Sequence, residues 1–151
     1  MNTTAINKIL QNCSVTAKYY QGCFACDTIS RNTLYPCSIV INFDSSMFTG
    51  SHWVAVFATS PFQAFYFDSL SMDSPSMPII NYLSAFKHVY RNKIRFQNLN
   101  SNICGKYVVV FIYFMSKYLN FNKFITLLSS HDNADYFINE FYRKIYSNCI
   151  L

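Results

Sequence analysis

The chain is poor in charge, glycine and proline. Only 13% of its 151 residues are charged, and it contains 3 glycines and 4 prolines. A disordered chain needs many charges and few aromatic residues, whereas 19% of this chain is Phe, Trp or Tyr. The scarcity of glycine and proline also excludes collagen-like repeats and flexible or proline-rich linkers. At this length we expect a single domain, residues 1–151, with one sizeable core.

Long apolar runs are absent as well. The longest, residues 107–115, is nine residues long, whereas a membrane-spanning helix needs about 20. The first ten residues, MNTTAINKIL, lack the apolar stretch of a secretion signal. We therefore expect a protein that is neither secreted nor bound to a membrane. In a reducing compartment, its six cysteines are expected to be free thiols.

Cys23 and Cys26 have the spacing of a zinc or redox motif. A structural zinc site needs a second pair of ligands at suitable spacing, and none of the later Cys or His residues provides one. A thioredoxin-like site needs a strand–helix–strand frame, which the surrounding sequence does not show. We therefore predict no metal site and favour core cysteines for this pair.

The order of predicted elements indicates an α+β fold. Apolar spacing predicts a short helix capped by Thr3 or Thr4, followed by irregular chain over residues 13–36. Strands are expected at residues 37–42, 52–58, 64–68 and 93–97, the second and third as an antiparallel hairpin. Helices are expected over residues 78–90, 104–119, 121–128 and 134–146, the last capped by Asp132 or Asn133. This order is not a Rossmann-like alternation.

Two polar residues mark the ends of the predicted hairpin. His52 opens one strand after a glycine-containing loop, where side chains reach the edge of a cleft. Asp68 ends the partner strand, so the two side chains are expected to be neighbours. A carboxylate there would hold one imidazole tautomer and favour the charged ring. The alternative is that Asp68 only caps the turn that follows.

A cysteine and a glutamine complete this candidate site. Cys104 begins the apolar helix, where the positive end of the helix dipole stabilises a thiolate. Gly105 would let a substrate backbone approach closely. Gln97 ends a predicted strand, and its side-chain amide could form an oxyanion hole with the backbone N–H of Cys104. The chain has only seven acids, and among them Asp68 alone falls at a strand end between the candidate His and Cys.

The whole set resembles the adenovirus protease (adenain) and its Ulp/sentrin-protease relatives. The matching segments are Gly50-Ser-His-Trp-Val-Ala-Val-Phe, Phe65-Tyr-Phe-Asp-Ser-Leu, Gln97 and Asn102-Ile-Cys-Gly. Their order, His, acid, Gln and Cys, is that of these enzymes, and the seven-residue step from Gln97 to Cys104 fits the adenain branch. The resemblance implies a papain-like α+β fold, with a central mixed sheet and a buried helix carrying the Cys at its N-terminus.

The resemblance implies a cysteine endopeptidase that cuts viral precursor proteins at Gly-containing sites. Its triad would be Cys104, His52 and Asp68, with Gln97 in the oxyanion hole. No cofactor would be required for the chemistry. The resemblance further implies a monomer that acts in the virion and in the host nucleus or cytoplasm.

The resemblance also concerns substrate contacts and activators. Trp53 and Gly105 would contact the substrate. Adenain is activated by a viral peptide, joined through a disulfide, and by DNA, but residues 69–97 contain no cysteine for such a bond. A noncovalent peptide and DNA stay open as activators. The candidate DNA-binding residues, in a stretch without acids, are Lys87, Arg91, Lys93 and Arg95. Their alternative is an ordinary solvated face.

Three other functions stay open at this point. The chain could be an isopeptidase that removes ubiquitin or SUMO-like modifiers, with the same fold and site. It could be a catalytically inactive binding module of this fold. It could also be a DNA-binding protein without peptidase activity.

Overall fold

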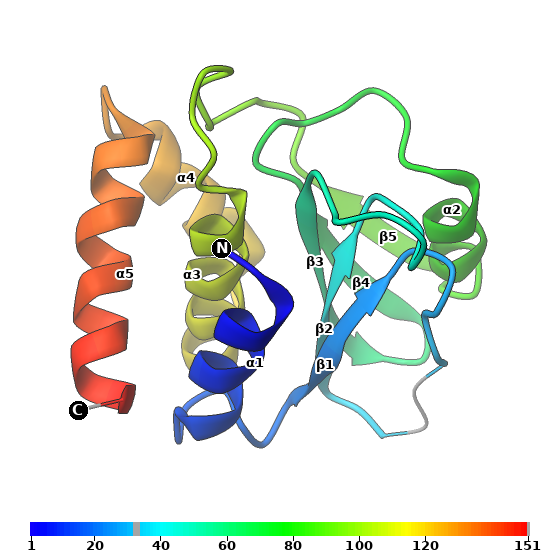
Figure 1. Cartoon of the computed structure of the whole chain (residues 1–151). Coiled ribbons are helices and arrows are strands. Elements are labelled where there is room, and N and C mark those ends of the chain that lie inside the picture. The colour runs from blue at the N-terminus through cyan, green and yellow to red at the C-terminus, as the bar shows by residue number, and fades with distance from the viewer. Residues whose placement is uncertain (32–33, 151) are drawn as a thin grey trace.

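Figure 1 shows the computed structural model of the chain, which describes residues 1–31 and 34–150. The elements are, in order, α1 (Thr3–Asn12), β1 (Tyr20–Ala25), β2 (Cys37–Asn42), β3 (Trp53–Ser60), β4 (Gln63–Phe67), α2 (Met77–Leu83), β5 (His88–Arg91), α3 (Cys104–Tyr118), α4 (Phe121–Ser129) and α5 (Ala134–Ile150). The predicted α+β class is confirmed. Within the described residues, no helix is long and apolar enough to cross a bilayer.

The strands form one mixed sheet in the order β1-β2-β3-β4-β5. The two outer pairs, β1 with β2 and β4 with β5, are parallel, and the two inner pairs are antiparallel. The predicted hairpin is confirmed in β3 and β4, where Ser60 pairs with Gln63 and Ala55 with Phe67. The beginning of β3 therefore lies beside the end of β4.

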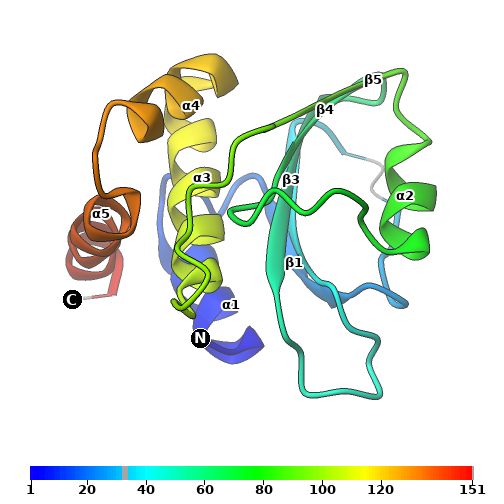
Figure 2. The same ribbon diagram turned by 90° about the horizontal axis from the view of Figure 1, so that it is seen from above.

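Helices cover both faces of this sheet, as Figure 2 shows from above. Side chains alternate between the faces of a strand. Ala55 and Phe57 accordingly pack among residues of α1, α3, α4 and α5, whereas Val54 and Val56 pack toward α2. Every residue of β2 is buried, as expected for a strand covered on both sides.

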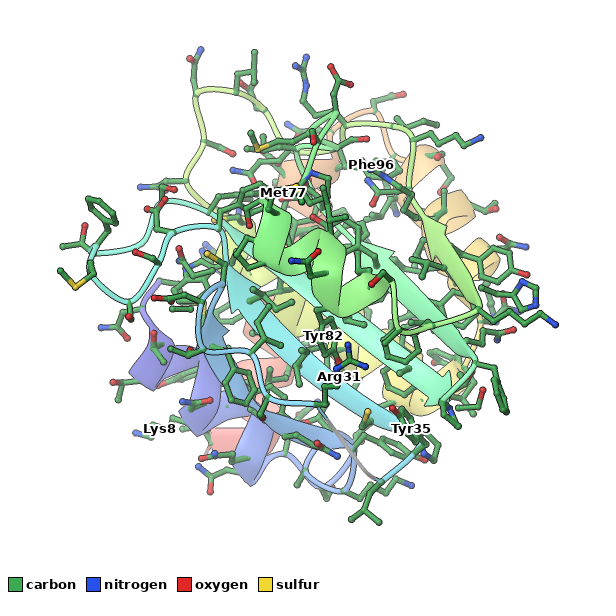
Figure 3. The ribbon with its side chains drawn as sticks, turned by 90° about the vertical axis from the view of Figure 1, so that its right-hand side faces the viewer. Lys8, Arg31, Tyr35, Met77, Tyr82 and Phe96 are labelled. Carbon is green, nitrogen blue, oxygen red and sulfur yellow. A yellow bond between two sulfur atoms is a disulfide. The ribbon has the colours of Figure 1, made fainter. Side chains whose placement is uncertain are left out.

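Figure 3 looks onto the face that carries α2. Tyr82 of α2 is buried against this face, with Phe86 beside it at a ring-centroid distance of 5.7 Å. Arg31 and Tyr35 lie next to Tyr82 and line a small cavity with it. One short helix and the loops around it are therefore enough to close this side of the sheet.

The other face is covered by α3, which is the buried helix expected from the sequence. It has 15 residues, most of them buried between the sheet and the remaining helices. A helix that is apolar on nearly all sides needs such an enclosed position. Its first residue is Cys104, so the packing of α3 sets where this thiol lies.

Several predicted boundaries and caps need correction. The cap of α1 is Asn2, whose side chain accepts from the N–H of Ala5, rather than Thr3 or Thr4. Asn133, one of the two residues predicted to cap α5, does so by accepting from the N–H of Tyr136. The expectation of irregular chain after α1 is wrong for β1. That strand contains a glycine and no β-branched residue, and it gains its extended form by pairing with β2.

The segment after α2 also differs from the prediction. The helix ends at Leu83, well before Tyr90, and the following strand is β5 rather than residues 93–97. Tyr90 belongs to β5 and stacks on Phe65 of β4, with ring centroids 5.5 Å apart. Three of the four β5 residues are exposed, so the alternation that marks a half-buried strand is missing from its sequence.

The expectation of six free thiols is wrong for two cysteines. Cys13, just after α1, forms a disulfide with Cys149 near the end of α5. The two helices pack side by side, which brings the Cα atoms of these residues to 4.6 Å. The residues are 136 positions apart in the chain, and nothing in their local sequence indicates the pairing.

Candidate active site

The fold brings His52, Asp68 and Cys104 together from three elements. His52 immediately precedes β3, Asp68 immediately follows β4, and Cys104 begins α3. Nε2 of His52 lies 2.6 Å from Oδ1 of Asp68, and His52 lines one cavity with Cys104, whose thiol interacts with the ring. The three residues are only 6%, 1% and 7% exposed. The predicted proximity of His52 and Asp68 is confirmed.

Asp68 has both of the roles that the sequence left open. Its carboxylate accepts from His52, and it also accepts from the backbone N–H of Leu70 at 2.9 Å and of Met72 at 3.0 Å. It therefore caps the turn after β4 while it holds the imidazole. Burial alone would raise the pKa of Asp68, but the hydrogen bonds from His52 and the two amides keep it below its usual range.

The environment of His52 favours the charged ring. Burial lowers the pKa of His52, yet the hydrogen bonds and charges of Asp68 and Cys104 outweigh burial and raise that pKa to about 9. Asp68 holds Nε2, which leaves Nδ1 for the thiol. The ring of Phe43 packs against the imidazole at a centroid distance of 5.3 Å and helps to fix its plane.

Cys104 lies where a thiolate is stabilised. The cap position of α3, Ile103, offers no side-chain hydrogen bond, so the backbone N–H groups of the first turn are left to other partners. The sulfur interacts with the N–H groups of Trp53 and Gly105 and with His52. Burial opposes ionisation, but these interactions lower the pKa of Cys104 below that of an ordinary thiol. The site can therefore hold a thiolate–imidazolium pair.

Gln97 reaches the same cleft, from a loop rather than from the predicted strand end. Its side chain is 3% exposed, accepts from the hydroxyl of Ser69 at 2.7 Å and donates from Nε2 to the carbonyl of Ser101 at 2.8 Å. Gln97, His52 and Cys104 all line one cavity of about 250 Å³. A larger hollow of about 640 Å³ adjoins it, with Gln97 as the shared residue.

The two predicted substrate contacts, Trp53 and Gly105, both touch Met1. The indole N–H of Trp53 donates to the carbonyl of Met1 at 3.2 Å. A Cβ built on Gly105 would meet side-chain atoms of Met1 at 2.7–3.3 Å. The absence of a side chain at Gly105 therefore leaves a space, and in this structure the side chain of Met1 fills it.

Gly50 shapes the loop that leads into His52. It has a φ of +88°, in the region that favours glycine, and a Cβ there would lie 2.5 Å from the side-chain nitrogen of Asn42. Gly50 lines the cavity with His52. Both the turn and the closeness of Asn42 require a residue without a side chain.

The predicted DNA-binding residues lie along β5 and the segments on either side of it. Lys87 precedes the strand, Arg91 ends it, and Lys93 and Arg95 follow it. Arg91 is engaged within the fold, because it donates to the carbonyl of Met72 at 2.7 Å and lies over the ring of Tyr66. The other three side chains are exposed.

The motif cysteines Cys23 and Cys26 are both free and are not joined to one another. Burial raises the pKa of Cys23 to about 12, which makes it a poor nucleophile. In the part of the chain that the structure describes, no group of three His, Cys, Asp or Glu residues could hold a metal ion.

Two buried residues next to the site were missed by the sequence analysis. Ser69 holds Gln97, and Asn92 is hydrogen-bonded to the backbone of Asp68. Ser69 lies within the Asp-Ser-Leu segment that carried the resemblance, so its position was a usable signal. Asn92 lies between the helix predicted to end at residue 90 and the strand predicted to begin at residue 93. No local sequence pattern marks it as a residue of the site.

Comparisons with known proteins relate this chain to others by structure. No protein-family model matches it, and no curated protein sequence does. Two structures of the ASFV pS273R protease match over 100% and 99% of this chain and 67% of theirs, with TM-scores of 0.60 and 0.59 at 20% and 17% identity. The central domain of the uncharacterized Lpg1148 protein from Legionella pneumophila matches over 99% of this chain and 97% of its own, with a TM-score of 0.56 at 12% identity. These chains share its fold.

Proposed function

We propose that the protein is a cysteine peptidase. The observation that carries the proposal is the position of His52, which is hydrogen-bonded to Asp68 and lines one cavity with Cys104. The thiol of Cys104 begins a helix and has a lowered pKa. Nucleophile, base and orienting group in this arrangement are the components of a catalytic triad. The fold shared with the ASFV pS273R protease supports this function.

In the proposed reaction, Cys104 attacks the peptide carbonyl as a thiolate. His52 holds the proton and passes it to the leaving amine, which leaves an acyl-enzyme. His52 then takes a proton from water, which attacks the thioester carbonyl and releases the acid and the thiol. Asp68 keeps the imidazole oriented and charged. Gln97 and the backbone N–H at Cys104 stabilise the oxyanion. None of these steps needs a cofactor.

The proposed substrates are Gly-containing segments of viral precursor proteins. The sequence resemblance to the adenain group supports this choice, and so do the contacts of Trp53 and Gly105 with Met1. A substrate strand that runs over Gly105 has to displace Met1, and glycine residues next to the scissile bond would leave the most room there. Cleavage of a ubiquitin-like fusion in preference to such peptides would instead assign the isopeptidase function.

The decisive test is replacement of the proposed nucleophile. Purified Cys104→Ala and His52→Ala are expected to lose peptidase activity by about 10³-fold or more, because each removes a member of the triad. The matched control is Cys23→Ala, a partly buried free thiol with a raised pKa, which should keep wild-type activity. The assay is mass spectrometry of Gly-containing peptides. Undiminished cleavage by Cys104→Ala would refute the proposed function.

A further inference from the structure

Ser69 links two residues of the proposed site, Asp68 and Gln97. It directly follows Asp68 and is fully buried. Its hydroxyl donates to Oε1 of Gln97 at 2.7 Å, and its carbonyl oxygen accepts from the backbone N–H groups of Phe96 at 2.9 Å and Gln97 at 3.0 Å. One residue thus holds Gln97 through its side chain and through the main chain.

These contacts fix which way the amide of Gln97 points. The carbonyl of Ser101 can only accept a hydrogen bond, so the atom 2.8 Å from it must be Nε2. Oε1 then faces the hydroxyl of Ser69. Within the described chain, Ser101 is the one acceptor for Nε2, which has two hydrogens. The second hydrogen is left for a ligand in the cleft that Gln97 shares with Cys104.

We propose that Ser69 is a positioning residue that orients the Gln97 amide toward the developing oxyanion. This inference rests on the proposed peptidase function. An oxyanion donor is effective only when it is held in place before the reaction. Without the hydroxyl, Oε1 of Gln97 is a buried acceptor without a donor, which costs free energy. Rotation of the amide toward water would remove this cost. Because the interaction matters in the transition state, its loss lowers kcat and leaves KM unchanged.

A double-mutant cycle tests the coupling of the two residues. We expect kcat to fall about 10²-fold in Gln97→Ala, as for loss of one oxyanion donor. Ser69→Ala should lower kcat about tenfold, as for loss of one buried hydrogen bond. The double variant should be no slower than Gln97→Ala, because Ser69 acts through that side chain. The matched control is Ser38→Ala, a buried serine whose hydroxyl has no hydrogen-bond partner in the described chain.

Clear outcomes would overturn the proposal. These are wild-type kcat in Ser69→Ala, a change confined to KM, or losses that multiply in the double variant. Ser69→Cys provides a second variant if Ser69→Ala does not fold. Its thiol is a weaker donor, and its kcat should lie between those of wild type and Ser69→Ala.

A measurement without substrate separates this proposal from the peptidase proposal. The side-chain NH₂ signals of Gln97 in an ¹⁵N–¹H spectrum should be sharp in wild type and in Ser38→Ala. They should shift and broaden in Ser69→Ala as the amide gains a second orientation. If wild type cleaves no peptide, the peptidase proposal fails, and these signals still decide the role of Ser69. Unchanged Gln97 signals in Ser69→Ala would overturn it.

Discussion

The proton shared between His52 and Cys104 decides how the site behaves with pH. The pKa of Cys104 is lowered and that of His52 is raised to about 9, so the two are charged together over the interval between these values. Below the interval the thiol is protonated. Above it, His52 is neutral while Cys104 stays a thiolate. Alkylation needs only the thiolate, whereas peptide hydrolysis also needs the proton on His52.

We therefore predict different pH profiles for alkylation and hydrolysis. Alkylation of Cys104 by iodoacetamide should stay fast below the pKa of an ordinary thiol and persist above pH 9. The kcat/KM for peptide hydrolysis should fall as the pH rises through about 9, because His52 of the free enzyme loses the proton meant for the leaving amine. The rates are measured by peptide mass spectrometry, with Cys23 as an internal control for a thiol of raised pKa.

His52→Ala separates this explanation from simple exposure of the thiol. In that variant the pKa of Cys104 should return toward that of a normal thiol, so alkylation at neutral pH should slow markedly. An identical alkylation profile in wild type and His52→Ala would show that the ion pair does not control Cys104.

At the scale of elements, the site depends on one hairpin and one helix. Two short apolar runs, residues 52–58 and 64–68, are separated by Ser60-Pro61, a dipeptide typical of turns. This pattern was enough to predict that β3 and β4 pair, and hence that His52 and Asp68 meet. The apolar run after Cys104 was enough to predict α3. Strand β1 was missed because it contains a glycine and no β-branched residue, and β5 because three of its four residues are exposed, so that neither shows the alternation of a half-buried strand. Pairing with β2 and β4 supplies their hydrogen bonds. The loop position of Gln97 was missed as a consequence. The predicted strand ended at residue 97, whereas β5 ends at Arg91 and leaves Gln97 in the loop that follows.

Asn92 supports the point where β4 ends. The last residue pair of β4 and β5 is Tyr66 with Arg91. Beyond it, the buried side chain of Asn92 accepts from the N–H of Asp68 at 3.0 Å and donates to the carbonyls of Asp68 at 2.7 Å and Ile94 at 2.9 Å. This side chain replaces the strand pairing that would otherwise continue, and it keeps Asp68 in place beside His52.

We predict that Asn92→Ala lowers the free energy of unfolding by about 1–3 kcal/mol, because backbone groups at Asp68 lose their partner. Asn92→Asp should cost more, since it removes both donors and places a second carboxylate near Asp68. Urea unfolding followed by circular dichroism gives these values. The control is Asn81→Ala, an exposed asparagine of α2. Equal midpoints for Asn92→Ala and Asn81→Ala would show that Asn92 does not support this end of β4.

At the scale of the molecule, the net charge is +5, and six of the twelve Lys and Arg residues can be divided into two groups at different places in the fold. Lys8 is on α1, Lys18 precedes β1 and Lys144 is on α5. Lys87, Lys93 and Arg95 flank β5, the strand at the opposite edge of the sheet from β1. Figure 1 shows α1 and α5 on one side of the molecule and β5 on the other. The positive net charge of the molecule attracts any polyanion. If DNA binds one specific surface, reversing the charges of one group must therefore lower DNA affinity more than reversing those of the other.

We propose that DNA binds the group at β5 and predict a local effect of charge reversal. The triple variant Lys87→Glu, Lys93→Glu and Arg95→Glu should bind a labelled duplex more weakly than wild type. Each lost phosphate contact should also reduce the slope of log affinity against log salt by about 0.9. Fluorescence anisotropy over a series of salt concentrations measures both. Arg91 is left in place because its contacts with Met72 and Tyr66 belong to the fold.

The matched control changes the net charge by the same amount at the other group, through Lys8→Glu, Lys18→Glu and Lys144→Glu. If the surface at β5 is specific, this control should lose much less affinity and keep the wild-type salt slope. Equal losses in the two triple variants would mean that DNA responds only to the net charge of the molecule. Wild-type affinity that does not fall with added salt would exclude phosphate contacts altogether, because counterion release is what makes them salt-dependent.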